Sequence, residues 1–258
     1  MVGAVSLPSV AARCGYSEWV NAPDVVCFAG QDWWYHNRAH SDFQLMLRVA
    51  EVRRVLLVNS IGMRLPVPGR SSQPFRRMAR KAASMLRGLR QPVEGLPGFT
   101  VFTPFLLPFY GNDRLRAVNA RLVRAQVQRR MQKLGMQQPH VVVTVPTAWD
   151  VAKDLERSSL VYNRSDKHSA FPEAATGVIA RCERQLFAHA DRVLYSSNAL
   201  MDFEAGRCGE RARLLDHGVD LAHFRPRPQT HALTRLGARR PILGLDRKST
   251  RLNSSHRT

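Results

Sequence analysis

The chain has 258 residues, 44% of them hydrophobic, and a formal net charge of +19. This length is enough for one large or two small domains with a sizeable core. No stretch approaches the roughly 18 uninterrupted apolar residues of a spanning helix, and residues 1–8 lack the basic start of a secretory signal. We therefore expect a cytoplasmic globular protein without a membrane-spanning segment.

The cysteines exclude two further classes of protein. They stand at positions 14, 27, 182 and 208. This spacing contains no C-x-x-C pair, so it indicates neither a zinc site nor a disulfide framework. We expect reduced thiols and no metal site.

Short apolar runs alternate with helical patterns along the chain, which indicates a parallel sheet with crossover helices. Strands are predicted at 24–28, 54–59, 99–102, 140–145, 160–162, 192–195 and 213–215. Helices are predicted at 41–51, 74–90, 112–134 and 176–189, with Gly135 closing the third. The fold class is therefore α/β, with a doubly wound, Rossmann-like parallel sheet over residues 1–225.

The chain changes character after this first domain. Pro226 and Pro228 indicate a linker, because two prolines in three residues cannot continue a helix or a strand. Residues 226–245 are predicted to hold this linker and the first strand of a truncated second domain, at 241–244. Residues 246–258 are abruptly polar and resemble translated adapter sequence, so we expect an unpacked cloning or assembly scar. A disordered native tail is the alternative.

The segment from residue 70 to 90 is strongly basic and contains no acid. Its apolar residues recur at helical spacing: Phe75, Met78, Ala82, Met85, Leu86 and Leu89. This combination is typical of a helix that lies in a membrane interface with its basic residues on anionic headgroups. We expect Arg76, Arg77, Arg80 and Lys81 to face the inner surface of the plasma membrane; an ordinary solvated surface helix is the alternative.

In an open parallel sheet the ligand sits beyond the carboxyl ends of the strands. The loop after the first strand has one glycine, Gly30, so it is not a G-x-G-x-x-G dinucleotide loop, and no P-loop occurs in the chain. Rings and polar groups suited to a sugar follow this glycine: Asp32, Trp33, Trp34, Tyr35, His36 and His40. An aromatic cluster at the edge of the core is the alternative.

The loop after the fifth strand brings an acid, a histidine and two bases within a few residues. Asp166 and His168 are each able to bind an acceptor hydroxyl or to act as a general base, and Arg164 stands beside them. A solvated turn capped by Ser165 and Asp166 would fit the same residues.

Three segments, 161–166, 183–200 and 215–226, carry a family resemblance. They resemble the amino-terminal domain of family 4-like (group 1) glycosyltransferases of the GT-B fold, nearest the bacterial teichuronic-acid biosynthesis subgroup. That family has a strand with a "YD..D" turn, a helix with a glutamate, "aD.v...S..L" and "pNGVD...F.P" in this order. The resemblance covers about residues 20–228. It departs at Asn163, where the subgroup usually has an acid, and it lacks the second, nucleotide-binding domain.

The resemblance implies a nucleotide-sugar donor, a glycan or lipid-linked acceptor, no cofactor and no nucleic-acid partner. It implies that the first loop, with Gly30, Trp33 and His36, faces the cleft between the two domains. Asp166 would lie in the acceptor pocket, with Arg164 and Ser196 near it. The candidate acid–base residues are Asp166, His168 and Asp32.

The resemblance also assigns residues around the hinge between the two domains. Gly218 and Asp220 would form the turn into the hinge. Structural alternatives remain for two acids, since Asp220 could cap that turn and Glu183 could be an exposed helix residue.

Two other functions compete with a glycosyltransferase. A nucleotide-dependent oxidoreductase or epimerase would need the glycine-rich first turn that this chain lacks. A non-catalytic, basic membrane- or polyanion-binding α/β domain would explain the charge and would leave the chemistry of the strand-end loops unused.

Overall fold

The computed structural model describes residues 22–36, 38–61, 74–107, 113–168 and 176–219, without the side chains of residues 74–78, 176 and 205. The chain divides into two compact units, 1–217 and 218–258, and only Gly218 and Val219 of the second are described. The predicted strand at 241–244, the tail at 246–258 and Asp220 therefore lie outside the described residues.

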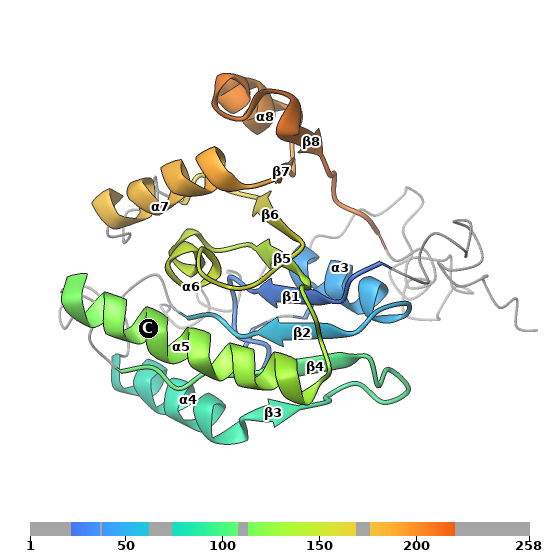
Figure 1. Ribbon diagram of the computed structural model, residues 1–258, viewed down its shortest axis with the longest axis vertical. Helices are drawn as coiled ribbons and strands as arrows, with labels where there is room; N and C mark the ends of the chain where they lie inside the picture. The colour runs from blue at the N-terminus through green and yellow to red at the C-terminus, as the bar shows by residue number, and fades with distance from the viewer. Residues whose placement is uncertain (1–21, 37, 62–73, 108–112, 169–175, 220–258) are drawn as a thin grey trace, which may run out of the picture. The chain divides into compact units, whose positions relative to one another are not determined.

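The first unit is built on an eight-stranded sheet in the order β3-β4-β2-β1-β5-β6-β7-β8 (Figure 1). The strands are β1 Val25–Phe28, β2 Val55–Val58, β3 Leu89–Arg90, β4 Phe99–Phe102, β5 His140–Val143, β6 Ser159–Arg164, β7 Arg192–Tyr195 and β8 Ala212–Leu214. All neighbours pair in parallel except β3, which is antiparallel to β4. The order reverses beside β1, with β2 and β4 on one side and β5 to β8 on the other. The predicted doubly wound parallel sheet is confirmed.

Helices cover both faces of this sheet. They are α3 Ser41–Ala50, α4 Pro74–Arg87, α5 Asp113–Lys133, α6 Trp149–Ala152, α7 Thr176–His189 and α8 Asn198–Glu204, with 3-10 turns η1 Pro146–Ala148, η3 Ala205–Arg207 and η4 Gly209–Arg211. Val123, Trp149 and Leu186 bring α5, α6 and α7 into one core cluster, and Phe43 brings α3 into the other. Among the described helices, none has the length and hydrophobicity required to traverse a bilayer.

The strands follow from their sequences. β1, β2 and β4 are buried along their whole length, as expected where helices cover both faces and leave no solvated side for alternation. Gly135 adopts a φ of 65° directly after α5, which confirms the predicted helix end, because glycine enters the left-handed region without a steric penalty.

The predicted helix at 74–90 is wrong at its carboxyl end. Gly88 has a φ of 58° and ends α4 at Arg87, and Leu89–Arg90 then pairs with β4 as the short edge strand β3. The sequence analysis also did not predict α6 and α8, which are only four and seven residues long.

Candidate functional site

The carboxyl ends of β1 and β5 meet where the strand order reverses, and ligands of open α/β sheets bind at such points. Gly30 follows β1, and Thr144 follows β5. A Cβ atom on Gly30 would lie 3.5 Å from Thr144 Oγ1, an ordinary contact, and the φ of Gly30 is not positive. Neither crowding nor backbone geometry requires a glycine at this position.

The turn after β1 is fastened to α4 through the Asp32 carboxylate, which is 7% exposed. Its Oδ1 accepts a hydrogen bond from the Trp34 amide at 3.0 Å, and its Oδ2 accepts one from Ser84 Oγ at 2.8 Å. Lys81 Nζ lies 3.9 Å from Oδ2 and donates to the Ser60 carbonyl oxygen at 2.6 Å. Burial lowers the pKa of Lys81, and the nearby Asp32 opposes this shift.

The same network reaches the ends of two more strands. Ser84 Oγ lies 3.1 Å from Thr103 Oγ1, and Asn59 Nδ2 donates to Thr103 Oγ1 at 2.8 Å. Asn59 Oδ1 in turn accepts the Trp33 amide at 2.9 Å. Asn59 follows β2 and Thr103 follows β4, so buried polar groups connect three strand ends to one helix.

Trp33 is a core residue and does not line a cleft, which corrects the predicted sugar-stacking role. It is 1% exposed, and its ring centroid lies 5.2 Å from that of Phe43 and 5.0 Å from that of Phe99. Trp34 and Tyr35 are half-buried, with the Arg87 guanidinium 4.9 and 5.4 Å from their ring centroids. Trp33 packs between α3 and β4 because its large apolar ring stabilises the fold more when it is buried.

Two other residues from the same loop lie at the surface. His36 is exposed, and its Nδ1 lies 3.1 Å from both the amide and the carbonyl oxygen of Asp32. His40 is exposed directly before α3.

The exposed side of α4 carries apolar side chains beside its arginines, and its inner side carries both polar and apolar side chains. Ala79, Ala82, Ala83 and Leu86 are exposed, Leu86 at 87%. The predicted apolar face is thus divided, because Met85 and Leu89 pack against the core while Ala82 and Leu86 face solvent.

The basic residues of α4 are divided in the same way. Lys81 was predicted to face a membrane, but its side chain is only 28% exposed, and its ammonium group lies 3.9 Å from Asp32 Oδ2 and donates to the Ser60 carbonyl oxygen. Arg80 is exposed, with its guanidinium 5.8 Å from the Tyr35 ring. The side chains of Arg76 and Arg77 lie outside the described part of the chain.

Arg164, the last residue of β6, is fully buried, which corrects its predicted position in the cleft. Its Nη1 donates to Glu183 of α7 at 2.5 Å. Its Nη2 and Nε donate to the two carboxylate oxygens of Glu204 of α8 at 2.9 and 3.1 Å. Glu183 is 2% exposed, so the alternative of an exposed helix acid is wrong.

The turn at residues 165–168 follows this buried cluster. Ser196, which follows β7 and is half-buried, donates from Oγ to the Ser165 carbonyl oxygen at 2.9 Å. Asp166 is exposed, whereas His168 is 6% exposed and donates its amide to the Asp166 carbonyl oxygen at 3.0 Å. Burial, and after it the charge of Arg164, lowers the pKa of His168. Asp166 is therefore the candidate acid–base residue that faces solvent at this edge.

Gly218 and Asp220 were predicted to form the turn into the hinge. Gly218 is exposed, and a Cβ atom added to it would meet nothing within 4 Å among the described residues, while Asp220 lies outside them. Within the described ranges, no group of three or more histidine, cysteine or acidic side chains is arranged to hold a metal ion.

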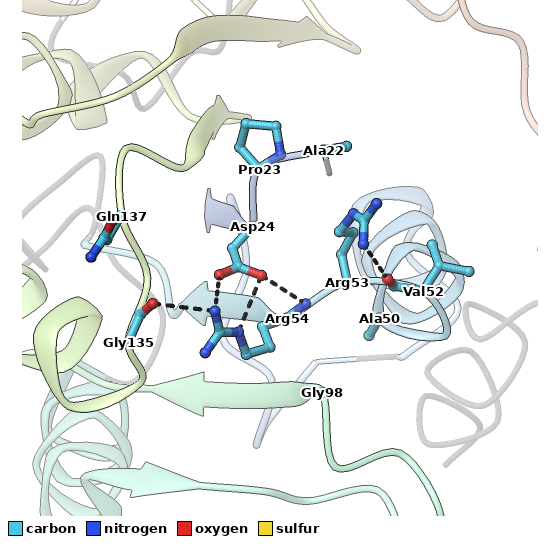
Figure 2. Close-up of a pocket in the computed structure, with 10 residues that line it drawn as sticks. All are labelled: Ala22, Pro23, Asp24, Ala50, Val52, Arg53, Arg54, Gly98, Gly135 and Gln137. Atoms are coloured by element: carbon cyan, nitrogen blue, oxygen red, sulfur yellow. Dashed lines mark hydrogen bonds and ion pairs between the residues drawn. The ribbon is translucent and has the colours of Figure 1, made fainter. Parts of the chain in front are cut away.

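A hollow of about 520 Å³ lies at the opposite edge of the sheet, beside the amino ends of β1 and β2 (Figure 2). Arg54 crosses it, with Nη2 2.7 Å from Asp24 Oδ2 and 3.2 Å from the Gly135 carbonyl oxygen. A Cβ atom on Gly98 would approach the Ala50 carbonyl oxygen to 2.8 Å, so glycine is required there. Arg54 connects the starts of β1 and β2 to the end of α5. The hollow is the space around these contacts, which have a structural role.

The sequence analysis missed several residues of the carboxyl edge. They are Asn59, Ser84, Thr103, Thr144 and Glu204. Asn59, Thr103 and Thr144 each stand directly after a predicted strand or at its end, so their positions carried a usable signal. Ser84 and Glu204 carried none, because their partners Asp32 and Arg164 lie 52 and 40 residues away in the sequence.

Two of the three segments of the family resemblance, 161–166 and 183–200, lie on described strands and helices, whereas residues 220–226 of the third lie outside the described residues. Val161 to Arg164 lies in β6 and leads into the turn with Asp166. Glu183 lies in α7, and Ser196 directly follows β7.

No protein-family model matches the chain, and no curated protein sequence matches it. Several solved structures align with it. Sucrose-phosphate synthase from Thermosynechococcus elongatus is 10% identical with a TM-score of 0.44, and the alignment covers 76% of this chain and 90% of that one. Anabaena HepE in complex with UDP and glucose is 13% identical with a TM-score of 0.48, covering 83% and 50%.

The third structure, a glycosyltransferase from Rickettsia africae, is 8% identical with a TM-score of 0.46, covering 84% of this chain and 48% of that one. The chain thus spans about half the length of the last two proteins. Similarity at this level carries no argument about function, which rests on the topology and on the residues of the site.

Proposed function

We propose that the chain is the acceptor-side domain of a family 4-like GT-B glycosyltransferase. The enzyme transfers a sugar from a nucleotide-sugar donor to a cell-envelope polysaccharide or a lipid-linked acceptor. The observation that carries this proposal is the reversal of strand order beside β1, with Gly30 and the turn at 165–168 at the carboxyl ends of the strands. The family resemblance of residues 161–166, 183–200 and 215–226 supports the reaction class, because a fold alone does not fix a function.

Asp166 is the residue that we assign to the acceptor hydroxyl. Its exposure leaves the carboxylate accessible at the end of β6, whereas Asp32 and His168 are buried. Asp32 also has both carboxylate oxygens engaged by Trp34 and Ser84. Asp166 therefore orients or deprotonates the acceptor, and the nucleotide-sugar serves as a co-substrate without a further cofactor.

The assignment is tested in the complete protein that joins this domain to a nucleotide-binding domain. Asp166→Asn should lower turnover by about 10²- to 10⁴-fold, with donor affinity unchanged. The matched control is Asp202→Asn, which neutralises another exposed acid, on α8. An Asp166→Asn enzyme with unchanged kcat and KM would remove this residue from the mechanism, and absence of transfer by the unmodified protein would overturn the function itself.

The 258-residue chain alone should bind nucleotide-sugars weakly at best and show no turnover. Catalysis in a two-domain cleft requires both walls to hold donor and acceptor in reacting geometry. Isothermal titration with UDP-sugars and GDP-sugars measures the binding, and transfer of a radiolabelled sugar measures the turnover. Robust transfer by this chain would contradict the division of roles between the two domains.

We also propose that the protein is cytoplasmic and contacts the inner face of the plasma membrane through α4. The exposed face formed by Ala79, Ala82, Ala83 and Leu86, flanked by Arg80 and Arg87, supports this contact. Apolar side chains enter the acyl boundary while arginines bind anionic headgroups. Each arginine contributes about 1 kcal/mol near an anionic surface, and salt screens this attraction.

Co-sedimentation with phosphatidylglycerol and phosphatidylcholine vesicles tests the membrane contact. Binding should require the anionic lipid and should fall in Arg80→Gln/Arg87→Gln and in Leu86→Ser. Arg192→Gln/Arg213→Gln is the control, because it removes the same charge from exposed positions on β7 and β8. Equal binding to both lipids would contradict the proposed contact.

A non-catalytic, membrane- or polyanion-binding domain is the second candidate, and the same exposed face of α4 favours it. The two candidates differ in one result. Vesicle binding by a complete protein that transfers no sugar from any nucleotide-sugar donor would support the non-catalytic function.

A further inference from the structure

The buried cluster around Arg164 lies at the carboxyl end of β6, the end of the sheet at which ligands of α/β proteins bind. Arg164 is the last residue of β6, and its guanidinium donates hydrogen bonds to acids on α7 and α8. Glu204 receives two of its N–H groups and Glu183 receives a third. Tyr162 Oη accepts a further contact at 3.1 Å from Nη1. The exposed side chains of Asp166 and Lys167 follow within three residues.

Stability alone does not account for this arrangement. The side chains of Arg164 and Glu204 are 0% exposed and that of Glu183 is 3% exposed. Taking such charges out of water costs free energy, and apolar side chains of similar volume often give equal or greater stability. The distinctive contribution of a guanidinium is geometric, because its planar fork fixes the orientation of a carboxylate with two parallel hydrogen bonds.

Backbone pairing and one hydrogen bond connect the cluster to the turn at 165–168. The backbone of Arg164 pairs with β7 opposite Tyr195, and the next residue, Ser165, accepts the hydroxyl of Ser196 at 2.9 Å. The side chain of Arg164 thus fixes the end of β6, and Ser196 fixes the first residue of the turn from the neighbouring strand.

We propose that Arg164 is a positioning residue: held by Glu183 and Glu204, it fixes the turn at 165–168 and so sets where Asp166 stands against a bound acceptor. This inference rests on the proposed function and gives Arg164 an indirect role in place of acceptor contact. A displacement of about 1 Å at a reacting group can cost about 100-fold in rate.

The test separates positioning from stability with a compensated variant, Arg164→Met/Glu183→Met/Glu204→Met. It removes the whole charge cluster and keeps apolar volume, so the urea midpoint should be unchanged or raised. In the complete protein the acceptor KM should rise or kcat should fall, lowering kcat/KM for the acceptor by about 10- to 100-fold, while the donor KM stays unchanged. Amide hydrogen exchange at 165–168, measured in the 258-residue chain, should become faster.

Arg211→Met is the matched control. Arg211 donates to the carbonyl oxygens of Phe187 and Ala190 at 2.7 and 2.6 Å, at the start of β8 and away from the turn. It should lower the urea midpoint and leave both the acceptor KM and the exchange of the turn unchanged. If the compensated variant does not fold, Glu204→Gln replaces it, since the amide keeps the volume and loses the charge.

The outcomes distinguish the two proposals. A variant with unchanged acceptor kinetics and unchanged exchange at 165–168 overturns the positioning role. An unmodified complete protein without transferase activity overturns the proposed function, and the exchange measurement then still tests whether the cluster fixes the turn.

Discussion

The turns after β1 and after β6 lie on the same edge of the sheet and are held by different chemistry. A network of hydroxyl, amide and carboxylate groups connects the first turn to α4. Buried charges fix the strand end before the second turn, between α7 and α8, with the exposed Arg207 4.0 Å from Glu204. The first turn should therefore respond mainly to loss of a hydrogen-bonding group, and the second mainly to loss of a charge.

The largest effect is expected at the charged cluster. Arg164→Met alone leaves Glu183 and Glu204 buried without their shared cation, and removal of one partner from a buried ion pair costs about 3 to 5 kcal/mol. Urea unfolding monitored by circular dichroism measures the loss. A change below about 1 kcal/mol would show that the two carboxylates find other partners.

A smaller effect is expected at the turn after β1. Ser84→Ala removes the hydroxyl between Asp32 and Thr103, and a buried acceptor left without its donor costs about 1 to 3 kcal/mol. The control is Ala83→Ser, an exposed neighbour on α4, which should change stability by less than about 0.5 kcal/mol. Equal effects in both variants would remove the network as the anchor of this turn.

The stability of the protein should depend on pH through the buried His168. Burial, followed by the charge of Arg164, holds the pKa of His168 below its value in the unfolded chain. The unfolded state then binds more protons once the pH falls below about 6.5, so stability decreases on acidification. His168→Gln should flatten this decrease in urea unfolding series at successive pH values. An unchanged slope would assign the acid sensitivity to other groups.

The smallest change in stability is expected for Gly30→Ala. The added Cβ atom meets Thr144 Oγ1 at an ordinary 3.5 Å, and the backbone is not in the left-handed region. Unfolding free energy should change by less than about 0.5 kcal/mol, while acceptor affinity in the complete protein should fall. A large loss of stability would indicate that Gly30 is a packing requirement.

The parallel sheet was predictable from the sequence because its strands are continuous apolar runs. Val25–Phe28 and Val55–Val58 are buried on both faces, and such runs stand out between polar turns. The strand β3 was not predictable, since its two residues continue a helical pattern and only the conformation of Gly88 separates them from α4.

The sequence predicted which turns form the candidate site, but not which of their side chains are accessible. The rule that ligands bind after strand ends found the turns of Asp32 and Asp166, and it did not reveal which side chains are occupied inside the protein. Arg164 pairs with acids 19 and 40 residues away, and these contacts exist only once α7 and α8 have packed. Burial of a charged side chain is a property of tertiary structure, so the sequence could not reveal that Arg164, assigned to the cleft by the family resemblance, is buried.

The two lateral edges of the sheet differ in their protection. On one side, the antiparallel strand β3 is only two residues long and carries exposed Arg90, features that discourage pairing with another chain. On the other side, β8 is the last strand of the described sheet, with Leu214 43% exposed and the following Leu215 39% exposed. Self-association of the isolated domain at high concentration should therefore proceed through β8, and Leu214→Lys should suppress it.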